Sequence, residues 1–166
     1  ESWGVSSSSC ALCDASIVQG KPTVVVGGGD TAVEEALYLK RYTDVVYMVH
    51  RRDELRASGV MQDKLSKSGV RVVMESEVEE IVGGAHMTGV VIRNVRTGSR
   101  QEINAHSLFY GIGHVPATEL VKDKLETHHG GFLKLRDNSQ MTSMDGVVAA
   151  GDIADYISRQ AVCAAG

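Results

Sequence analysis

The chain has 166 residues, of which 43% are hydrophobic, enough to bury the core of one ordinary domain or slightly more. No apolar run approaches the roughly 18 to 20 residues that cross a bilayer, so the sequence predicts a soluble protein. With 17 Lys and Arg against 21 Asp and Glu, the net charge of −4 provides no global positive field for a nucleic acid or an anionic membrane. Only a local basic cluster could bind phosphate.

The first half of the chain predicts alternating strands and helices. A β-branched run that ends at Gly27 indicates a strand buried on both faces, and apolar residues at helical spacing follow it. The expected elements, in the order β-α-β-α-β, cover residues 23–26, 30–41, 45–49, 55–68 and 70–74. This order predicts a parallel sheet with crossover connections. The serine run at residues 6–9 is expected to be a solvated loop.

The second half changes character. Short strands separated by glycine pairs predict an antiparallel meander, and a further strand is expected to return to the main sheet. These strands cover residues 78–82, 88–95, 101–104 and 107–110. A boundary is expected near residues 111–114, and a late strand that runs into a turn is expected at 147–152. Cys163 lies in an apolar run and is expected to be a small core residue.

A glycine-rich turn joins the first strand to the first helix and carries the pattern G-x-G-x-x-A. It comprises Gly27, Gly28, Gly29, Asp30, Thr31 and Ala32. Glycines at such a turn let backbone N–H groups approach a pyrophosphate, whose charge also lies at the positive end of the helix. The alternative is a tight turn that binds no ligand.

A basic cluster follows the second expected strand, at the position where a site for NAD has an acidic residue. Here the sequence has His50, Arg51 and Arg52, with Arg56 four residues later. Guanidinium groups attract a 2′-phosphate and present paired donors to its oxygens, so the cluster favours NADPH over NADH. The alternative is a solvated surface turn.

Cys10 and Cys13 form a Cys-x-x-Cys pair, followed by Asp14. Two thiols at this spacing can close a small disulfide, and a nearby acid can exchange the proton that thiol–disulfide chemistry requires. Half of a zinc site and two inert buried cysteines are the alternatives. Because Cys163 stands alone and no second pair exists, we expect no metal. An odd number of cysteines with one such pair favours a reducing compartment.

Taken together in chain order, these motifs resemble the low-molecular-weight thioredoxin reductases. The matching segments are C-x-x-C-D from Cys10, G-G-G-D-T-A-V-E-E-A-L-Y-L from Gly27, H-R-R-D-x-x-R-A from His50, G-I-G-H-x-P-x-T from Gly111, A-A-G-D from Ala149, R-Q-A from Arg159 and A-A-G from Ala164. The resemblance implies an α/β fold: a Rossmann-like parallel sheet with an antiparallel β-meander, plus an incomplete second FAD-binding segment. Residues 1–112 would be an NADPH-binding domain with the Cys pair, and residues 113–166 the C-terminal part of an FAD-binding domain.

The resemblance implies that electrons pass from NADPH through FAD to Cys10 and Cys13, whose dithiol reduces thioredoxin. Asp14 would be the acid paired with the dithiol, and Glu34 would lie near the nicotinamide. The pyrophosphate would be lined by Gly27, Gly29, Asp30, Thr31 and Ala32. The 2′-phosphate would be held by His50, Arg51, Arg52 and Arg56. The cofactor would be bordered by Ile112 and Gly113, and FAD would be contacted by Asp152, Arg159, Gln160 and Ala161.

Family members also have an N-terminal FAD-binding half that this chain lacks. We therefore expect the chain to be a fragment that binds NADPH, holds FAD weakly or not at all, and is inactive alone. By the same resemblance, the full-length protein would be a cytoplasmic homodimer. Two alternatives remain: the flavoprotein subunit of alkyl hydroperoxide reductase, and an NADP-binding module without turnover. A related flavoenzyme that reduces ferredoxin lacks the Cys pair, so the pair in this chain weighs against that class.

Overall fold

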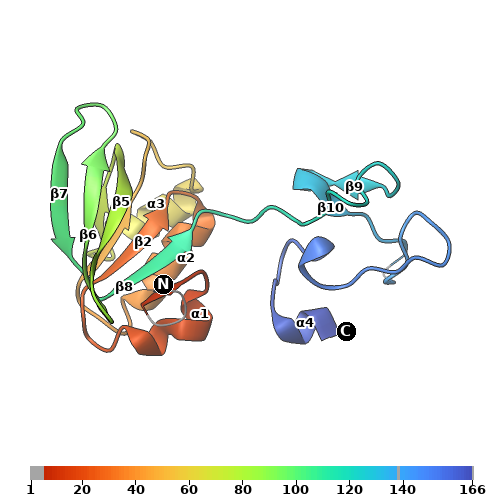
Figure 1. Cartoon of the computed structure of the whole chain (residues 1–166), viewed down its shortest axis with the longest axis horizontal. Helices are drawn as coiled ribbons and strands as arrows, with labels where there is room; N and C mark the ends of the chain where they lie inside the picture. The colour runs from red at the N-terminus through yellow and green to blue at the C-terminus, as the bar shows by residue number, and fades with distance from the viewer. Residues whose placement is uncertain (1–5, 138, 166) are drawn as a thin grey trace. The chain divides into compact units, whose positions relative to one another are not determined.

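The chain folds into two compact units, Glu1–Gly113 and His114–Gly166, shown in a computed structural model (Figure 1). The structure describes residues 6–137 and 139–165. Gly166, which closes the expected A-A-G motif, lies outside these described residues. Across the part of the chain that is described, no helix combines the length and the apolar composition that membrane crossing requires.

The first unit is built on a five-stranded, all-parallel sheet with the strand order β1-β8-β2-β3-β4. Its strands are β1 (Ser7–Ser8), β2 (Thr23–Gly27), β3 (Val46–Val49), β4 (Arg71–Val73) and β8 (Ser107–Gly111). Its helices are α1 (Ala11–Asp14), a 3₁₀ turn at Ala15–Ile17, α2 (Asp30–Leu39) and α3 (Gly59–Ser66). The predicted parallel sheet and its returning last strand are confirmed.

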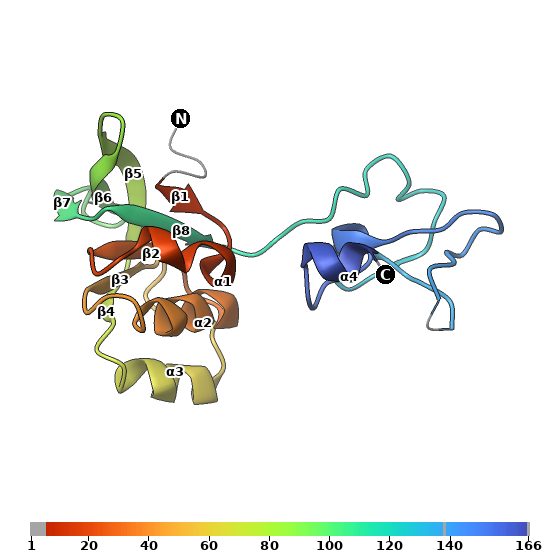
Figure 2. The same ribbon diagram turned by 90° about the horizontal axis from the view of Figure 1, so that it is seen from below.

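A three-stranded antiparallel sheet forms the predicted meander, in the order β5-β6-β7. Its strands are β5 (Ser76–Gly83), β6 (Met87–Asn94) and β7 (Arg100–Asn104). Helices α2 and α3 lie on one face of the parallel sheet, and the meander lies on the other (Figure 2). The central strands are therefore covered on both faces, which explains their continuous apolar runs.

Two core clusters reflect the alternation of side chains along these strands. One face packs with helix α2 and contributes Val25, Met48 and Phe109. The opposite face packs with the meander and contributes Val24, Val49 and Leu108. The carboxyl ends of β2 and β8 meet at Gly27 and Gly111, which are paired in register. This meeting point positions the glycine turn.

The expectation of a solvated serine loop is wrong for Ser6, Ser7 and Ser8, which are buried. Ser7 and Ser8 form β1 and pair with Leu108 and Phe109 of β8. Serines can form this edge strand because the backbone makes the ladder hydrogen bonds whatever the side chain. The serine run therefore leads directly from the sheet to the cysteine pair.

Helix α3 begins at Gly59, four residues later than the predicted start at residue 55. The backbone N–H groups of Arg56 and Ala57 instead donate to the carbonyl of Gly28, at 2.7 and 3.0 Å. N–H groups in the first turn of a helix have no intrahelical acceptor, so the carbonyl of Gly28 supplies an acceptor that a helix starting at residue 55 would not. The basic cluster thus lies on a loop, residues 50–58, that is attached to the glycine turn and is called the basic loop below.

The second unit has little regular structure. It contains the antiparallel pair β9 (Thr127–His128) and β10 (Phe132–Leu133), 3₁₀ turns at His129–Gly131 and Gly151–Ile153, and α4 (Ala161–Ala165). The strand expected within residues 147–152 is wrong, because Val148 makes only an isolated bridge to Met141, whereas the expected turn is present as the 3₁₀ turn that begins at Gly151. Cys163 is exposed, which corrects its expected core position, because a five-residue helix without a buried residue offers no core face.

Candidate functional site

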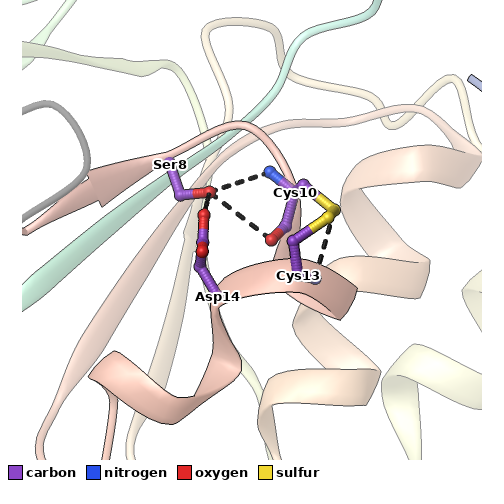
Figure 3. Close-up of a disulfide and its surroundings, with 4 residues drawn as sticks. All are labelled: Ser8, Cys10, Cys13 and Asp14. Carbon is purple, nitrogen blue, oxygen red and sulfur yellow. Dashed lines mark hydrogen bonds between the residues drawn. A yellow bond between two sulfur atoms is a disulfide. The ribbon is translucent and has the colours of Figure 1, made fainter. Parts of the chain in front are cut away.

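Cys10 and Cys13 form a disulfide, with Cα atoms 5.3 Å apart (Figure 3). Cys10 is the extended N-cap residue of α1, and the backbone N–H of Cys13 donates to its sulfur at 3.1 Å. Cys10 is half-buried and Cys13 is exposed, as is Leu12 between them. The pair is therefore accessible to a reaction partner, unlike a pair of inert buried cysteines. Among the described residues, no group of three or more His, Cys, Asp or Glu side chains could hold a metal ion.

The carboxylate of Asp14 points toward the hydroxyl of Ser8 (Figure 3). The hydroxyl of Ser8 donates to Asp14 Oδ2 at 2.5 Å and accepts from the backbone N–H of Cys10 at 3.0 Å. Ser8 was not among the expected site residues, since a serine in a serine run carries no distinctive signal. Its position two residues before Cys10 is the feature that could have identified it.

The glycine turn brings three chain segments into close contact. Gly27 has a φ of +149°, and a Cβ on it would lie 2.3 Å from the carbonyl oxygen of Gly111 and 2.7 Å from Cβ of Ala32. A Cβ on Gly28 would lie 2.3 Å from Nδ1 of His50. Gly29 caps the ten-residue helix α2, and a Cβ there would meet no atom within 4 Å. The first two glycines are required by packing, whereas the third borders open space.

A cavity of about 370 Å³ lies beside this turn. Its lining combines the turn with the basic cluster and includes Gly27, Gly28, His50, Arg51, Arg56 and Ile112. Glu77 also lines the cavity, and its carboxylate is paired with Arg93. Arg51 and Arg56 are exposed, and no ion pair within residues 6–137 and 139–165 neutralises either guanidinium. Two free cationic side chains beside the N-terminus of a ten-residue helix make the cavity suitable for a phosphorylated ligand.

His50 is 5% exposed and lies beneath the glycine turn rather than at the surface. Its Nε2 lies 3.0 Å from the carbonyl oxygen of Glu54. The imidazole therefore supports Gly28 from one side while it contacts the basic loop on the other. His50 can therefore have two roles: it packs against the glycine turn, and it lines the cavity.

The other residues expected at the nucleotide are distributed more widely. Thr31 is half-buried, Ala32 is fully buried beneath the turn, and Glu34 is exposed on α2. Arg52 is exposed but is not part of the cavity lining, and Gly113, with a φ of +88°, is not part of it either. The structure thus brings Arg51 and Arg56 to the cavity and does not bring Arg52 there.

The residues expected to contact FAD lie in the second unit. Asp152 and Arg159 line a cavity of about 220 Å³, whereas Gln160 and Ala161 are not in its lining. Arg159 adopts a φ of +48° in a loop organised by Asp155. The Asp155 carboxylate accepts the backbone N–H groups of Ile157, Ser158 and Arg159 at 2.8, 2.9 and 3.3 Å. The bonds from Ser158 and Ile157 lower the pKa of Asp155.

Asp155 was not predicted as a site residue. An aspartate whose carboxylate accepts the N–H groups of the next few residues forms an Asx turn, and the tendency of aspartate to form such turns can be read from the sequence. Its spacing to Arg159, four residues later, is the feature that could have indicated it.

The sequence profile described as pyridine nucleotide-disulphide oxidoreductase matches residues 2–166. Among curated relatives, the thioredoxin reductase of Streptomyces clavuligerus is 45% identical over 95% of this chain and 49% of its own length. The NADPH-dependent thioredoxin reductase 3 of Arabidopsis thaliana is 42% identical over 100% of this chain and 32% of its own length. The chain therefore spans half or less of the length of these relatives.

Solved structures agree with these relatives in fold. Thioredoxin reductase from Giardia duodenalis superposes with a TM-score of 0.89 at 43% identity, over 99% of this chain and 55% of that protein. The thioredoxin reductase from Streptococcus pyogenes superposes with a TM-score of 0.86 at 37% identity, over 96% of this chain and 52% of that protein. The α/β architecture described above is thus the architecture of about half of each neighbour.

Proposed function

Because the chain belongs to the pyridine nucleotide-disulphide oxidoreductase family, we propose that it forms the nucleotide-binding and disulfide-bearing part of an NADPH-dependent thioredoxin-disulfide reductase. One observation carries the proposal: the Cys10–Cys13 disulfide belongs to the same compact unit as the glycine turn and the cavity with two arginines. Such a reductase needs a site for the electron donor and a disulfide that receives the electrons. The thioredoxin partner comes from the names of the relatives.

At the nucleotide end, Arg51 and Arg56 would hold the 2′-phosphate, and the backbone at Gly28 and Gly29 would receive the pyrophosphate at the N-terminus of α2. The open space at Gly29 and the cationic lining of the cavity support this assignment. When bound, NADPH would supply a hydride, and FAD would supply the two-electron chemistry that connects this donor with the disulfide. In the second unit, Asp152 and Arg159 are the residues we assign to FAD, since they line one cavity.

At the disulfide end, two electrons and two protons convert the Cys10–Cys13 bond into two thiols. The dithiol then reduces thioredoxin by exchange. One thiolate attacks a sulfur of the partner disulfide to form a mixed disulfide, and the second thiolate displaces the partner. This step restores the Cys10–Cys13 bond and leaves two thiols on the partner. Asp14, whose carboxylate the Ser8 hydroxyl holds near the backbone of Cys10, is the group we propose to exchange protons during these steps.

Calorimetric titration of the chain with NADPH and with NADH tests the nucleotide assignment. We expect clearly tighter binding of NADPH. Loss of one charge-assisted contact, in Arg51→Ala or Arg56→Ala, should weaken NADPH by about 10- to 100-fold and leave NADH unchanged. Arg52→Ala is the matched comparison, because Arg52 lies outside the cavity lining and its loss should have a smaller effect. Equal affinity of the unmodified chain for both nucleotides would overturn the assignment.

A second experiment tests the disulfide. The chain is reduced with dithiothreitol, freed of the reagent and mixed with oxidised thioredoxin, and thiols are counted by alkylation and mass spectrometry. Electrons should move to thioredoxin, and Cys13→Ser should prevent completion of the transfer. Failure of transfer with intact NADPH binding would favour a nucleotide-binding module without turnover. For the full-length protein we propose a cytoplasmic homodimer, which size-exclusion chromatography and cell fractionation can test.

A further inference from the structure

The basic loop is fastened to the glycine turn by hydrogen bonds from three consecutive backbone N–H groups. Arg56 and Ala57 donate to the carbonyl of Gly28, at 2.7 and 3.0 Å, and Ser58 donates to Oδ1 of Asp30 at 2.7 Å. We call these three bonds the clasp. Two of them end on a backbone carbonyl, so the Asp30 carboxylate is the side chain through which the clasp can be altered.

We propose that Asp30 is a positioning residue that sets the preference for a 2′-phosphorylated nucleotide by holding the loop that carries Arg56. The inference rests on the proposed nucleotide site and refines it, since Asp30 was expected to line the pyrophosphate. Its carboxylate is instead engaged by Ser58, 28 residues away in sequence.

The physical argument is preorganisation. Asp30 is the first residue of the ten-residue helix α2, and Ala57 is buried in the core beside it, so both ends of the clasp are fixed. Arg56 directly precedes Ala57, its own N–H donates to the carbonyl of Gly28, and its exposed side chain lines the cavity. An arginine on an ordered backbone loses less conformational freedom when it binds phosphate, so more of its interaction appears as affinity. Without the clasp, ordering of the loop would oppose binding.

A positioning role for Asp30 and a direct effect of Asp30 on the pyrophosphate predict different changes in nucleotide affinity. NADPH and NADH share the pyrophosphate and differ by the 2′-phosphate. An aspartate that acted on the pyrophosphate through its charge would change the affinity for both nucleotides. An aspartate that acts through Arg56 would change the affinity for NADPH alone.

The test is titration calorimetry of the chain with NADPH and NADH. Asp30→Ala should weaken NADPH by about 3- to 10-fold, part of the roughly 10- to 100-fold effect of Arg56→Ala, and leave NADH unchanged. Asp30→Asn keeps an oxygen acceptor and should restore binding. Asp63→Ala removes a carboxylate from the exposed face of α3, outside the cavity, and serves as the charge-matched control. When Asp30→Ala is combined with Arg56→Ala, their effects on NADPH affinity should be strongly non-additive.

A second pair of variants removes the donor instead of the acceptor. Ser58 has a φ of −59°, which proline adopts, and its side chain makes no capping bond. Ser58→Pro should therefore reproduce Asp30→Ala, whereas Ser58→Ala should behave as the unmodified chain. Circular dichroism checks that each variant folds.

The outcomes separate the two proposals. If the unmodified chain does not prefer NADPH, the proposed nucleotide site is wrong. If it does prefer NADPH and Asp30→Ala weakens both nucleotides equally, weakens neither or tightens both, the positioning role of Asp30 is wrong. The same conclusion follows if Asp30→Asn fails to restore NADPH affinity, because the carboxylate charge rather than the hydrogen bond would then matter.

Discussion

The hydroxyl of Ser8 links the Asp14 carboxylate to the backbone of the disulfide loop, since it donates to Asp14 Oδ2 at 2.5 Å and accepts from the N–H of Cys10 at 3.0 Å. Ser8 belongs to the edge strand β1, so the link also joins the disulfide to the parallel sheet. The orientation of the acid beside the Cys pair is thus determined by a serine outside the Cys-x-x-Cys motif.

Replacement of Ser8 by alanine should destabilise the chain. The change leaves the Asp14 carboxylate without this donor and the Cys10 N–H without its acceptor, at a partly buried position. Loss of a hydrogen bond to a charged group costs about 1.5 to 3 kcal/mol. Urea unfolding of the oxidised chain measures the loss. Ser9→Ala is the control on the neighbouring residue, and equal midpoints for the two variants would contradict the linking role of Ser8.

Replacement of Gly28 by alanine should also destabilise the chain, because the new methyl group would lie 2.3 Å from the buried His50 ring. Overpacking of this kind costs about 1 to 3 kcal/mol. The melting temperature, followed by circular dichroism, should fall. Gly29→Ala is the matched comparison, since its methyl group meets no atom within 4 Å. If both variants melt alike, His50 does not support the turn as the structure indicates.

Alkylation with iodoacetamide should distinguish the three cysteines. Cys163 is free and exposed, whereas Cys10 and Cys13 are joined. The native oxidised chain should therefore take up one label, on Cys163, and the reduced and unfolded chain should take up three. Peptide mass spectrometry identifies the labelled residues. A Cys163 that resists labelling in the native chain would instead support the core position expected from its apolar neighbours.

The loop around Arg159 should lose order only at acidic pH. Backbone donors from Ser158 and Ile157 lower the pKa of Asp155, so the folded chain holds the carboxylate more strongly than the unfolded chain does. The stabilisation is therefore complete above the unfolded pKa of about 3.9 and is lost as the pH falls through the lowered folded pKa. Amide NMR shifts of Ile157 and Ser158 report the transition.

Asp155→Ala is the control for this pH effect and should remove the transition from both amides. A transition of these amides above the ordinary aspartate range would contradict the lowered pKa, because it would mean that the folded chain disfavours the ionised carboxylate.

Local patterns in the sequence were sufficient for most of the first unit. Strand β2, the glycine turn and helix α2 follow from a β-branched run, three glycines and helical spacing, all within residues 23–39. The meander followed from alternation and glycine pairs in the same way. The sequence also indicated that Cys10 and Cys13 can close a small disulfide, and the Cα separation of 5.3 Å in the folded chain meets the geometric requirement.

Tertiary structure decided what depends on partners distant in sequence. Ser7 is buried because Leu108, about a hundred residues later, pairs with it, and no property of a serine run predicts that neighbour. The contact of His50 with Gly28 and the bond from Ser58 to Asp30 likewise require the second strand and the loop after it to return to the first turn. Residues 147–152 show the converse, since a strand-like composition without a continuous partner forms only one bridge. Backbone hydrogen bonds between segments need both segments in place, and only the folded chain brings them together.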